Sequence, residues 1–275
     1  MHLTLRRVHR RTAKREAREP AFYISTPPAS PYTSFKMADP AFALPSYDEI
    51  HVWSTRLDDP KSDVGRLYET LTPDERDRAA RFYFEKHRRR FIVGRGILRH
   101  IIACYFGVGA AQIRFDYSLK GKPALAEPKV ENFSCNLSHS GDLALYAFSD
   151  GAPIGVDVEI LRPVEDMDAI ARRFFSSLEC DMLQGVPAAD RIEAFFNCWT
   201  RKEAYVKAVG LGLWIPLDSF TVSVAPSEPA RLVQLRSPSD DAAKWSIHHL
   251  RPAVDAVGAV AIPSLNRKLV LRQFA

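Results

Sequence analysis

Two acidic residues alternate with aliphatic residues in the segment IGVDVEI, residues 154–160. Successive side chains of a β-strand point to opposite faces, so Asp157 and Glu159 would share one face while Val156 and Val158 share the other. Two neighbouring carboxylates offer oxygen ligands to a hard cation, and Mg²⁺ commonly takes only one or two protein carboxylates together with substrate phosphates. A solvent-exposed strand face that happens to be acidic is the alternative interpretation.

A second group of polar residues has helical spacing in the segment FFNCWTRKEAYVK, residues 195–207. Trp199, Glu203 and Lys207 follow one another at intervals of four residues and would form one stripe on a helix. This stripe suits a catalytic site if Glu203 adds a third carboxylate to a metal ion that two others already hold. The alternative is a surface ion pair between Glu203 and Lys207, worth about 0.2–0.5 kcal/mol.

Two further segments have donors that could meet phosphate groups. The segment NLSHSG, residues 136–141, places His139 among small hydroxyl groups in what we expect to be a polar turn at a strand end. The segment LKGKP, residues 119–123, sets two amines around a glycine in a turn that Pro123 closes. A structural histidine and a solvated loop are the respective alternatives.

Local signals predict the elements that must carry these residues. Thr72 is an expected N-cap, because a proline at the first helical position and acids in the first turn follow it. The turn Asp150-Gly151 is expected to join two strands as a hairpin. We expect helices after residue 72 and at about 88–105, 167–175 and 191–209, a loop at 116–129, and strands near 51–53, 133–137, 143–148, 154–160, 220–224, 245–249, 256–261 and 269–271.

Length and composition indicate an ordinary globular protein, since 46% of the 275 residues are hydrophobic. No apolar run approaches the ~20 residues that cross a bilayer, and the N-terminus lacks a secretory signal. The four cysteines form no CxxC pair, so we expect reduced thiols and a cytoplasmic location, with neither a zinc site nor a disulfide scaffold.

The basic charge is concentrated at the N-terminus. Residues 1–36 carry a net charge of +6, and the rest of the chain carries −1, so the globular body offers no support for nucleic-acid binding. Residues 1–45 are basic and then rich in proline, serine and threonine, which predicts a disordered extension. The alternatives are a start codon assigned too early, with Met37 as the initiator, a targeting peptide, or an arm for anionic partners.

In their order and spacing, five segments together resemble the Sfp-type 4′-phosphopantetheinyl transferases. They are GKP (121–123), NLSHSG (136–141), IGVDVE (154–159), RRFF (172–175) and WTRKEAYVKAVGLGL (199–213). The resemblance runs from about residue 50 to residue 224. It implies an α+β fold and a monomer of two similar α/β halves related by a pseudo-twofold axis, with coenzyme A in the cleft between them. The expected halves are residues 46–151, on the coenzyme A side, and residues 152–275, with the metal ligands and the catalytic helix.

The resemblance also implies a reaction. Mg²⁺ is held by Asp157, Glu159 and Glu203 together with the pyrophosphate of coenzyme A. A serine of an apo acyl or peptidyl carrier protein attacks the β-phosphate, the 4′-phosphopantetheine group is transferred, and 3′,5′-ADP leaves. Asp157, Glu203 and Lys207 are the expected catalytic residues: Glu203, or a water on the metal, accepts the serine proton, and Lys207 neutralises the departing phosphate.

Binding of coenzyme A and of the carrier protein is expected to use basic and small polar residues. A second basic residue is frequent in the family where this chain has Glu75. Arg78 to Arg90 is the expected steering surface for an acidic carrier, and residues 162–191, with Arg172 and Arg191, are expected to dock it. The expected coenzyme A contacts are Arg78, Arg90, Lys122, Pro123, Ser138, His139 and Lys202.

Two other functions remain open at this stage. A different Mg²⁺-dependent enzyme that cleaves phosphodiesters could use the same clustered acids and lysine. A non-catalytic protein that binds coenzyme A or carrier proteins is the second alternative, although such a protein would not need all four of Asp157, Glu159, Glu203 and Lys207.

Overall fold

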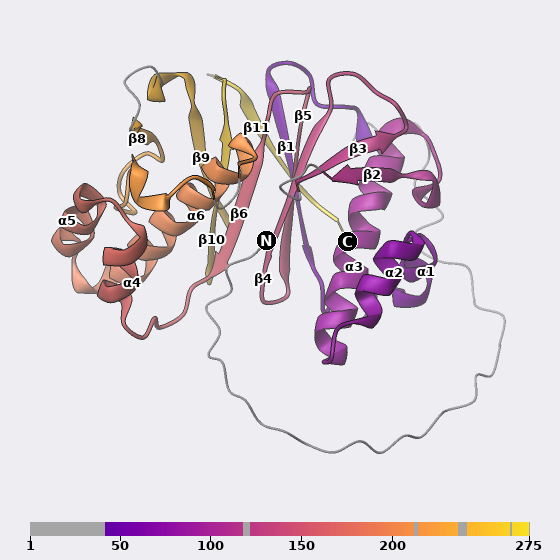
Figure 1. Ribbon diagram of the computed structural model, residues 1–275, viewed down its shortest axis with the longest axis horizontal. Coiled ribbons are helices and arrows are strands. Elements are labelled where there is room, and N and C mark those ends of the chain that lie inside the picture. The colour runs from indigo at the N-terminus through magenta and orange to yellow at the C-terminus, as the bar shows by residue number, and fades with distance from the viewer. Residues whose placement is uncertain (1–41, 118–121, 212–213, 236–240, 265, 275) are drawn as a thin grey trace.

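The computed structural model describes residues 42–117, 122–211, 214–235, 241–264 and 266–274. In these residues the two larger sheets pack against one another (Figure 1). The first sheet has the strand order β11-β1-β5-β4, and the second has the order β6-β10-β9. Their strands are β1 (Glu49–Arg56), β4 (Ser134–Ser140), β5 (Leu143–Ser149), β6 (Gly155–Ile160), β9 (Ser246–Ala253), β10 (Ala256–Ile262) and β11 (Lys268–Gln273).

One long helix covers the outer face of each sheet. Helix α3 (Glu85–Phe106) packs on the first sheet and helix α6 (Arg191–Val209) packs on the second (Figure 1). Each helix forms an apolar core with its own sheet, and a third core lies between the two sheets. This third core includes Leu145 of β5 and Val156 and Val158 of β6. The layers are therefore helix, sheet, sheet and helix, and this mixed architecture confirms the predicted α+β class.

Strand alternation decides what each face of β6 can carry. Val156 and Val158 face the first sheet, so Asp157 and Glu159 lie on the opposite face, towards α6. Both carboxylates are buried, Asp157 with 1% of its surface exposed and Glu159 with 9%. The alternative of a solvent-exposed acidic strand face is therefore excluded.

The N-terminal half adds two short helices and a small hairpin around α3. Helix α1 spans Val64–Glu69, helix α2 spans Pro73–Ala80, the 3₁₀ turn η3 spans Ala110–Gln112, and the hairpin pairs β2 (Arg114–Tyr117) with β3 (Pro123–Glu127). Thr72 precedes α2 as predicted, and its backbone N–H donates to Glu75 Oε2 at 3.0 Å, which satisfies one of the helix's first donors. The expected loop at 116–129 is thus partly a β-hairpin.

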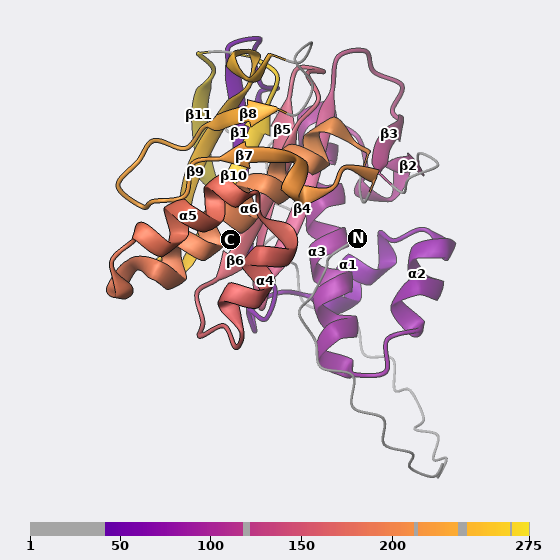
Figure 2. The same cartoon turned by 60° about the vertical axis from the view of Figure 1, so that its left-hand side comes forward.

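The C-terminal half surrounds α6 with short elements. Helices α4 (Met167–Phe174) and α5 (Ser177–Gly185) lie beside one another next to α6 (Figure 2). The remaining elements are η4 (Ala188–Asp190), η6 (Leu217–Ser219), β7 (Phe220–Val222), β8 (Leu232–Leu235) and η7 (Ala242–Lys244). None of the helices in the described ranges is both long enough and apolar enough to cross a membrane. The four cysteines are free thiols.

Three local predictions are corrected by the tertiary contacts. Asp150-Gly151 does not close a hairpin, because β5 pairs with β1 and β4 while β6 pairs with β10, so the turn connects the two sheets. The segment NLSHSG is mostly strand β4, and only Gly141, with a φ of 59°, begins the turn. Phe42 stacks on Trp53 at 5.0 Å and is buried, so the ordered body begins before residue 46. Residues 1–41 of the predicted extension lie outside the described residues.

Candidate active site

Helix α6 approaches β6 more closely than a side chain at residue 155 would allow. A Cβ atom on Gly155 would lie 2.1 Å from the carbonyl oxygen of Ala204 and 2.4 Å from the backbone nitrogen of Ala208. The missing side chain therefore brings the end of α6 onto the start of β6. As a result, Lys207 of the helix lies above Asp157 of the strand.

Lys207 bridges β4, β6 and α6 through its ammonium group. Its Nζ donates to Asp157 Oδ1 at 2.7 Å, to Ser138 Oγ at 3.0 Å and to the carbonyl oxygen of Val156 at 3.1 Å. Ser138 Oγ in turn donates to Asp157 Oδ1 at 2.8 Å. Lys207 of α6 therefore pairs with Asp157 of β6. This excludes the alternative in which Lys207 would only form a surface ion pair with Glu203 on the same helix.

Asp157 keeps one oxygen unused. Its Oδ2 atom is buried and has no hydrogen-bond partner among the residues that the structure describes. A buried carboxylate oxygen without a partner is costly, since it has lost its hydration without replacement. This oxygen therefore fits a cation, which would restore the missing interaction.

Burial and the nearby Asp157 carboxylate raise the pKa values of both Glu159 and Glu203. Burial and the neighbouring Asp157 carboxylate raise the pKa of Glu159, whose Oε2 accepts hydrogen bonds from Ser140 Oγ at 2.7 Å and from Arg162 at 3.1 Å. Burial, and then repulsion from Asp157, raise the pKa of Glu203 to about 7. Shifts of this kind gather at functional sites, because closely spaced acids cannot all ionise cheaply in a protein interior.

The three carboxylates are neighbours, but they do not enclose a common point. Within the described parts of the chain, no three His, Cys, Asp or Glu side chains are grouped tightly enough to coordinate one metal ion. The expected set of Asp157, Glu159 and Glu203 around one ion therefore stays a prediction. The donor type suits Mg²⁺, since all three residues offer hard oxygen atoms.

The expected nucleotide contacts lie on several elements. Arg78 is exposed on α2, with its guanidinium 5.2 Å from the centre of the Phe91 ring. Arg90 of α3 pairs with Asp58 through two nitrogen atoms, one of them at 2.8 Å. Both cations lie on helices of the N-terminal half.

Lys122 contacts helix α6 directly. Its Nζ donates to the carbonyl oxygens of Lys207 at 2.7 Å and Ala208 at 3.0 Å, and burial lowers its pKa. Cations stabilise the C-terminal end of a helix by satisfying its last carbonyl groups. Pro123 begins β3 directly after Lys122, while Lys120 and Gly121 lie outside the described residues.

Ser138 and His139 do not form one joint donor group, because β4 is extended at both positions. The Ser138 side chain is buried and points at Asp157, while His139 is exposed. Consecutive strand residues point to opposite faces, so the prediction that a turn brings these two side chains together is wrong. His139 is the member of the pair that an arriving phosphate could reach.

The structure contradicts the predicted coenzyme A contact of Lys202. This side chain is fully buried, and its Nζ contacts a carboxylate oxygen of Glu179 at 2.7 Å and the carbonyl oxygens of Leu217 at 2.7 Å and Phe220 at 2.6 Å. Those three acceptors use all three ammonium protons. Lys202 therefore ties α6 to α5 and to the start of β7.

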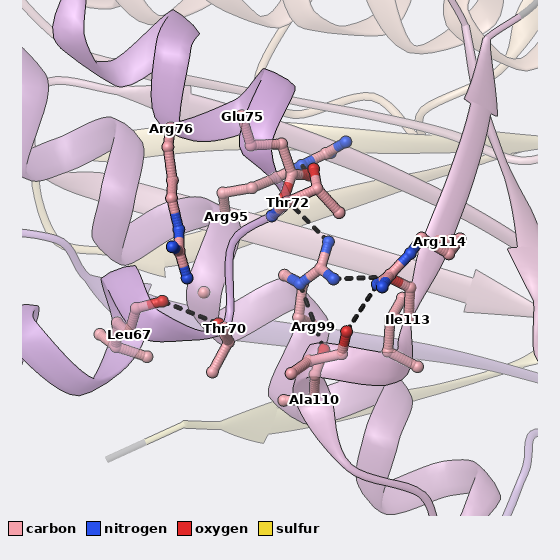
Figure 3. A network of polar contacts seen from close by, with 12 residues as sticks. Leu67, Thr70, Thr72, Glu75, Arg76, Arg95, Arg99, Ala110, Ile113 and Arg114 are labelled. Carbon is pink, nitrogen blue, oxygen red and sulfur yellow. Dashed lines mark hydrogen bonds and ion pairs between the residues drawn. The ribbon is translucent and has the colours of Figure 1, made fainter.

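Glu75 belongs to a buried ionic network that the sequence interpretation missed. Figure 3 shows it between Arg95 and Arg99 of α3, and Arg99 donates to Glu75 Oε2 at 2.8 Å. Arg99 also donates to the carbonyl oxygens of Ala110 and Ile113 (Figure 3). The network joins α2, which carries Arg78, to the long helix α3. The four-residue spacing of the two arginines on one helix face was the signal that could have revealed it.

The same network reaches the hairpin at its other end. Arg95 donates to the hydroxyl group of Tyr117 and lies with its guanidinium 4.3 Å from the centre of the Phe115 ring. Glu75 thus acts as an internal anchor for α2, α3 and β2. The fold accommodates an acid at this position because Arg95 and Arg99 both pair with it.

Buried carboxylates beside an amine, held on a strand and a helix of an α+β fold, suit an enzyme that positions and neutralises phosphate groups. Comparison with known proteins agrees with this class. Residues 153–261 match the model of the 4′-phosphopantetheinyl transferase superfamily, and residues 58–150 match the model described as 4′-phosphopantetheinyl transferase, N-terminal.

Individual relatives give the same result. The 4′-phosphopantetheinyl transferase HetI of Nostoc sp. is 44% identical over 216 residues, which cover 78% of this chain and 88% of the relative. The 4′-phosphopantetheinyl transferase Sfp of Bacillus subtilis is 34% identical over 157 residues, which cover 57% of this chain and 68% of the relative. The chain therefore belongs to the 4′-phosphopantetheinyl transferase superfamily, and it is a transferase.

Proposed function

We propose that this protein transfers the 4′-phosphopantetheine group of coenzyme A to a serine of an apo acyl or peptidyl carrier protein, in a Mg²⁺-dependent reaction that releases 3′,5′-ADP. The observation that carries the proposal is the buried contact between Asp157 and Lys207, with Glu159 and Glu203 in the same electrostatic field. This arrangement offers oxygen ligands to a cation and a positive charge to phosphate oxygens within one small volume.

Asp157, Glu159 and Glu203 would hold the metal ion. The unpartnered Oδ2 atom of Asp157 and the raised pKa values of the other two carboxyl groups support this assignment, because a cation would relieve both. When bound, Mg²⁺ supplies positive charge that offsets the negative oxygens of the pyrophosphate.

Glu203 and Lys207 have separate roles in the transfer. The serine oxygen of the carrier forms a bond to the β-phosphorus as the bond from that phosphorus to the 3′,5′-ADP oxygen breaks. Glu203 accepts the serine proton, because its carboxylate lies next to Asp157 and Lys207 in the same site. Lys207 stabilises charge on the departing phosphate, a task for which a preorganised ammonium group needs little rearrangement.

The nucleotide end of coenzyme A would contact the N-terminal half. Arg78, Arg90 and His139 are the donors we assign to its phosphates. Lys122, whose Nζ already donates to three carbonyl oxygens, and Pro123, the first residue of β3, are assigned to the same end of the ligand as neighbouring residues. The bond between Arg90 and Asp58 leaves part of the guanidinium fork for a phosphate, since arginine has five N–H donors. Lys122 links this end to the catalytic helix through its contacts with α6.

An open pocket of about 530 Å³ supports docking of the carrier on the C-terminal half. Arg172 of α4 and Arg191 at the start of α6 line it, and Arg191 pairs with Asp168 at 2.7 Å. Arg191 lies twelve residues before Glu203 on the same helix, or about 18 Å along its axis. If reversing the charge of Arg172 or Arg191 left the KM for the carrier unchanged, this docking assignment would be wrong.

We further propose that the protein acts as a monomer in the cytoplasm, with neither a nucleic acid nor a membrane as partner. We also propose residues 46–151 and 152–275 as its two halves, with Phe42 packed onto the first half and the last strand, β11, crossing over to pair with β1 of that half. Which carrier it serves is decided by experiment: candidate apo-carriers are incubated with the protein, coenzyme A and Mg²⁺ and then weighed by mass spectrometry. We expect the phosphopantetheine adduct, and its loss when the metal is chelated. Cleavage of coenzyme A without an adduct would favour a phosphodiester-cleaving enzyme, and binding without either product would favour a non-catalytic binder.

A further inference from the structure

Three alternate residues of β4 reach across to β6 with their side chains. Asn136 Oδ1 accepts from the backbone N–H of Val156 at 2.9 Å. Ser138 Oγ donates to Asp157 Oδ1 at 2.8 Å, and Ser140 Oγ donates to Glu159 Oε2 at 2.7 Å. The two strands belong to different sheets, so side chains make these bonds where neighbouring strands would use their backbones.

Each serine has its orientation determined by a second bond. Ser140 Oγ also accepts from the backbone N–H of Ile160 at 3.2 Å, and Ser138 Oγ also accepts from Lys207 Nζ at 3.0 Å. A hydroxyl group has a single proton to donate, and an accepted hydrogen bond on its oxygen leaves that proton directed at the carboxylate. The side chains of Asp157 and Glu159 are thereby held from the side of β4.

Asp157 and Ser138 are both buried, so the hydrogen bond between them is shielded from water. Asp157 and Ser138 expose 1% and 2% of their surfaces, so water cannot take over the hydrogen bond if the hydroxyl group is lost. With Oδ1 of Asp157 occupied by Ser138 and Lys207, Oδ2 is the oxygen left without a partner among the described residues. The bonds from β4 thus select which carboxylate oxygen is available.

We propose that Ser138 and Ser140 are positioning residues that orient Asp157 and Glu159 towards a divalent cation. This inference rests on the proposed function, since it takes the two carboxylates as metal ligands. It gives Ser138 a role different from the direct phosphate contact that its sequence motif suggested. Partners that orient metal ligands change metal affinity by about 10–100-fold when they are removed.

The test measures binding of Mn²⁺ to the full-length protein by electron paramagnetic resonance, without coenzyme A or carrier. Mn²⁺ replaces Mg²⁺ as the probe because both prefer carboxylate oxygens. We expect Ser140→Ala and Ser138→Ala each to weaken Mn²⁺ binding by about 10–100-fold, and Ser140→Thr to restore it, since threonine keeps the hydroxyl group. Ser134→Ala is the matched control: it removes a β4 serine bond of 3.0 Å to the carbonyl oxygen of Gly151, away from both carboxylates.

The outcomes separate this inference from the proposed function. Wild-type affinity for Mn²⁺ in both alanine variants would overturn the positioning role, and a Ser138→Ala variant that changed only the KM for coenzyme A would assign Ser138 to phosphate binding. Equal weakening in Ser134→Ala would show a general effect of strand β4 and would also refute the proposal. A wild-type protein that bound no Mn²⁺ and modified no carrier would instead remove the proposed function itself.

Discussion

Adding one methyl group at Gly155 tests whether the close approach of α6 to β6 creates the site. A Cβ atom there would lie 2.1 Å from the Ala204 carbonyl oxygen, whereas such contacts are essentially never shorter than 3.0 Å. Both clashing groups are backbone, so no side-chain rotation relieves them. The Gly155→Ala variant must move the helix and strand apart by roughly 1 Å, and displacements of that size at a reacting centre cost about 100-fold in rate.

The same displacement also affects stability. Overpacking a well-packed core costs about 1–3 kcal/mol, and here the obstruction is backbone on both sides, so we expect the upper part of that range or failure to fold. Urea unfolding gives the free energy, and the rate of carrier modification at saturating coenzyme A gives the effect on the site. Both should fall together in Gly155→Ala.

Gly185→Ala is the control for this experiment. Gly185 is the last residue of α5, and a Cβ atom there would meet no heavy atom within 4 Å. Alanine in a helix is more favourable than glycine by about 0.5–1 kcal/mol, so this variant should be as stable as the wild type or slightly more stable. A Gly155→Ala protein with wild-type stability and wild-type turnover would refute the argument that glycine sets the distance between Lys207 and Asp157.

Three further predictions test the charges separately. Lys207→Ala should lower the rate of carrier modification by about 10²–10³-fold, as measured in single turnover, and full turnover would contradict its role. Because the pKa of Glu203 is raised to about 7 from 4.5, the folded protein keeps a proton that the unfolded chain loses between these values. Stability of the metal-free protein should therefore fall as pH rises from 4.5 to 7, and Glu203 should contribute up to about 3 kcal/mol of this fall. Glu203→Gln should make the slope shallower in urea titrations, while Glu159, whose pKa is also raised, keeps part of it; identical slopes would contradict the assignment. Glu75→Gln should cost about 3–5 kcal/mol because it leaves two buried guanidinium groups poorly compensated, whereas Arg56→Gln, which breaks an exposed pair with Asp142, should cost at most about 1 kcal/mol. If Glu75→Gln and Arg56→Gln lowered the free energy of unfolding equally, burial would not determine the contribution of an ion pair to stability.

The interpretation of the sequence was most accurate where the signal is local. The alternation in residues 154–160 and the four-residue spacing of Trp199, Glu203 and Lys207 correspond to β6 and α6 as observed. The N-cap at Thr72 and the proline after it begin α2. Periods of 2 and 3.6 residues and helix caps depend on neighbours along the chain, so a single sequence contains the information.

The same reasoning was wrong where a residue's partner is distant. Asp150-Gly151 has the composition of a hairpin turn, but β6, which follows it, pairs with β10, about 100 residues later, while β5 pairs with β4 and with β1, about 90 residues earlier. Lys202 is adjacent to Glu203 in sequence, yet it turns into the core to meet Glu179 of another helix. Neither partner is visible in the local pattern, because strand pairing and ion pairing inside a fold depend on which elements pack together.

For this protein, the sequence alone determined where the candidate site residues lie within their own elements: two carboxylates on one face of a strand, and a carboxylate and an amine on one face of a helix. Only the tertiary structure decided how they meet. The absent side chain of Gly155 brings Lys207 to Asp157, and the hydroxyl groups of β4 hold Asp157 and Glu159 from the other side. Side-chain periodicity follows from backbone geometry within one element, whereas these contacts require elements far apart in the chain to pack within a few ångströms of each other.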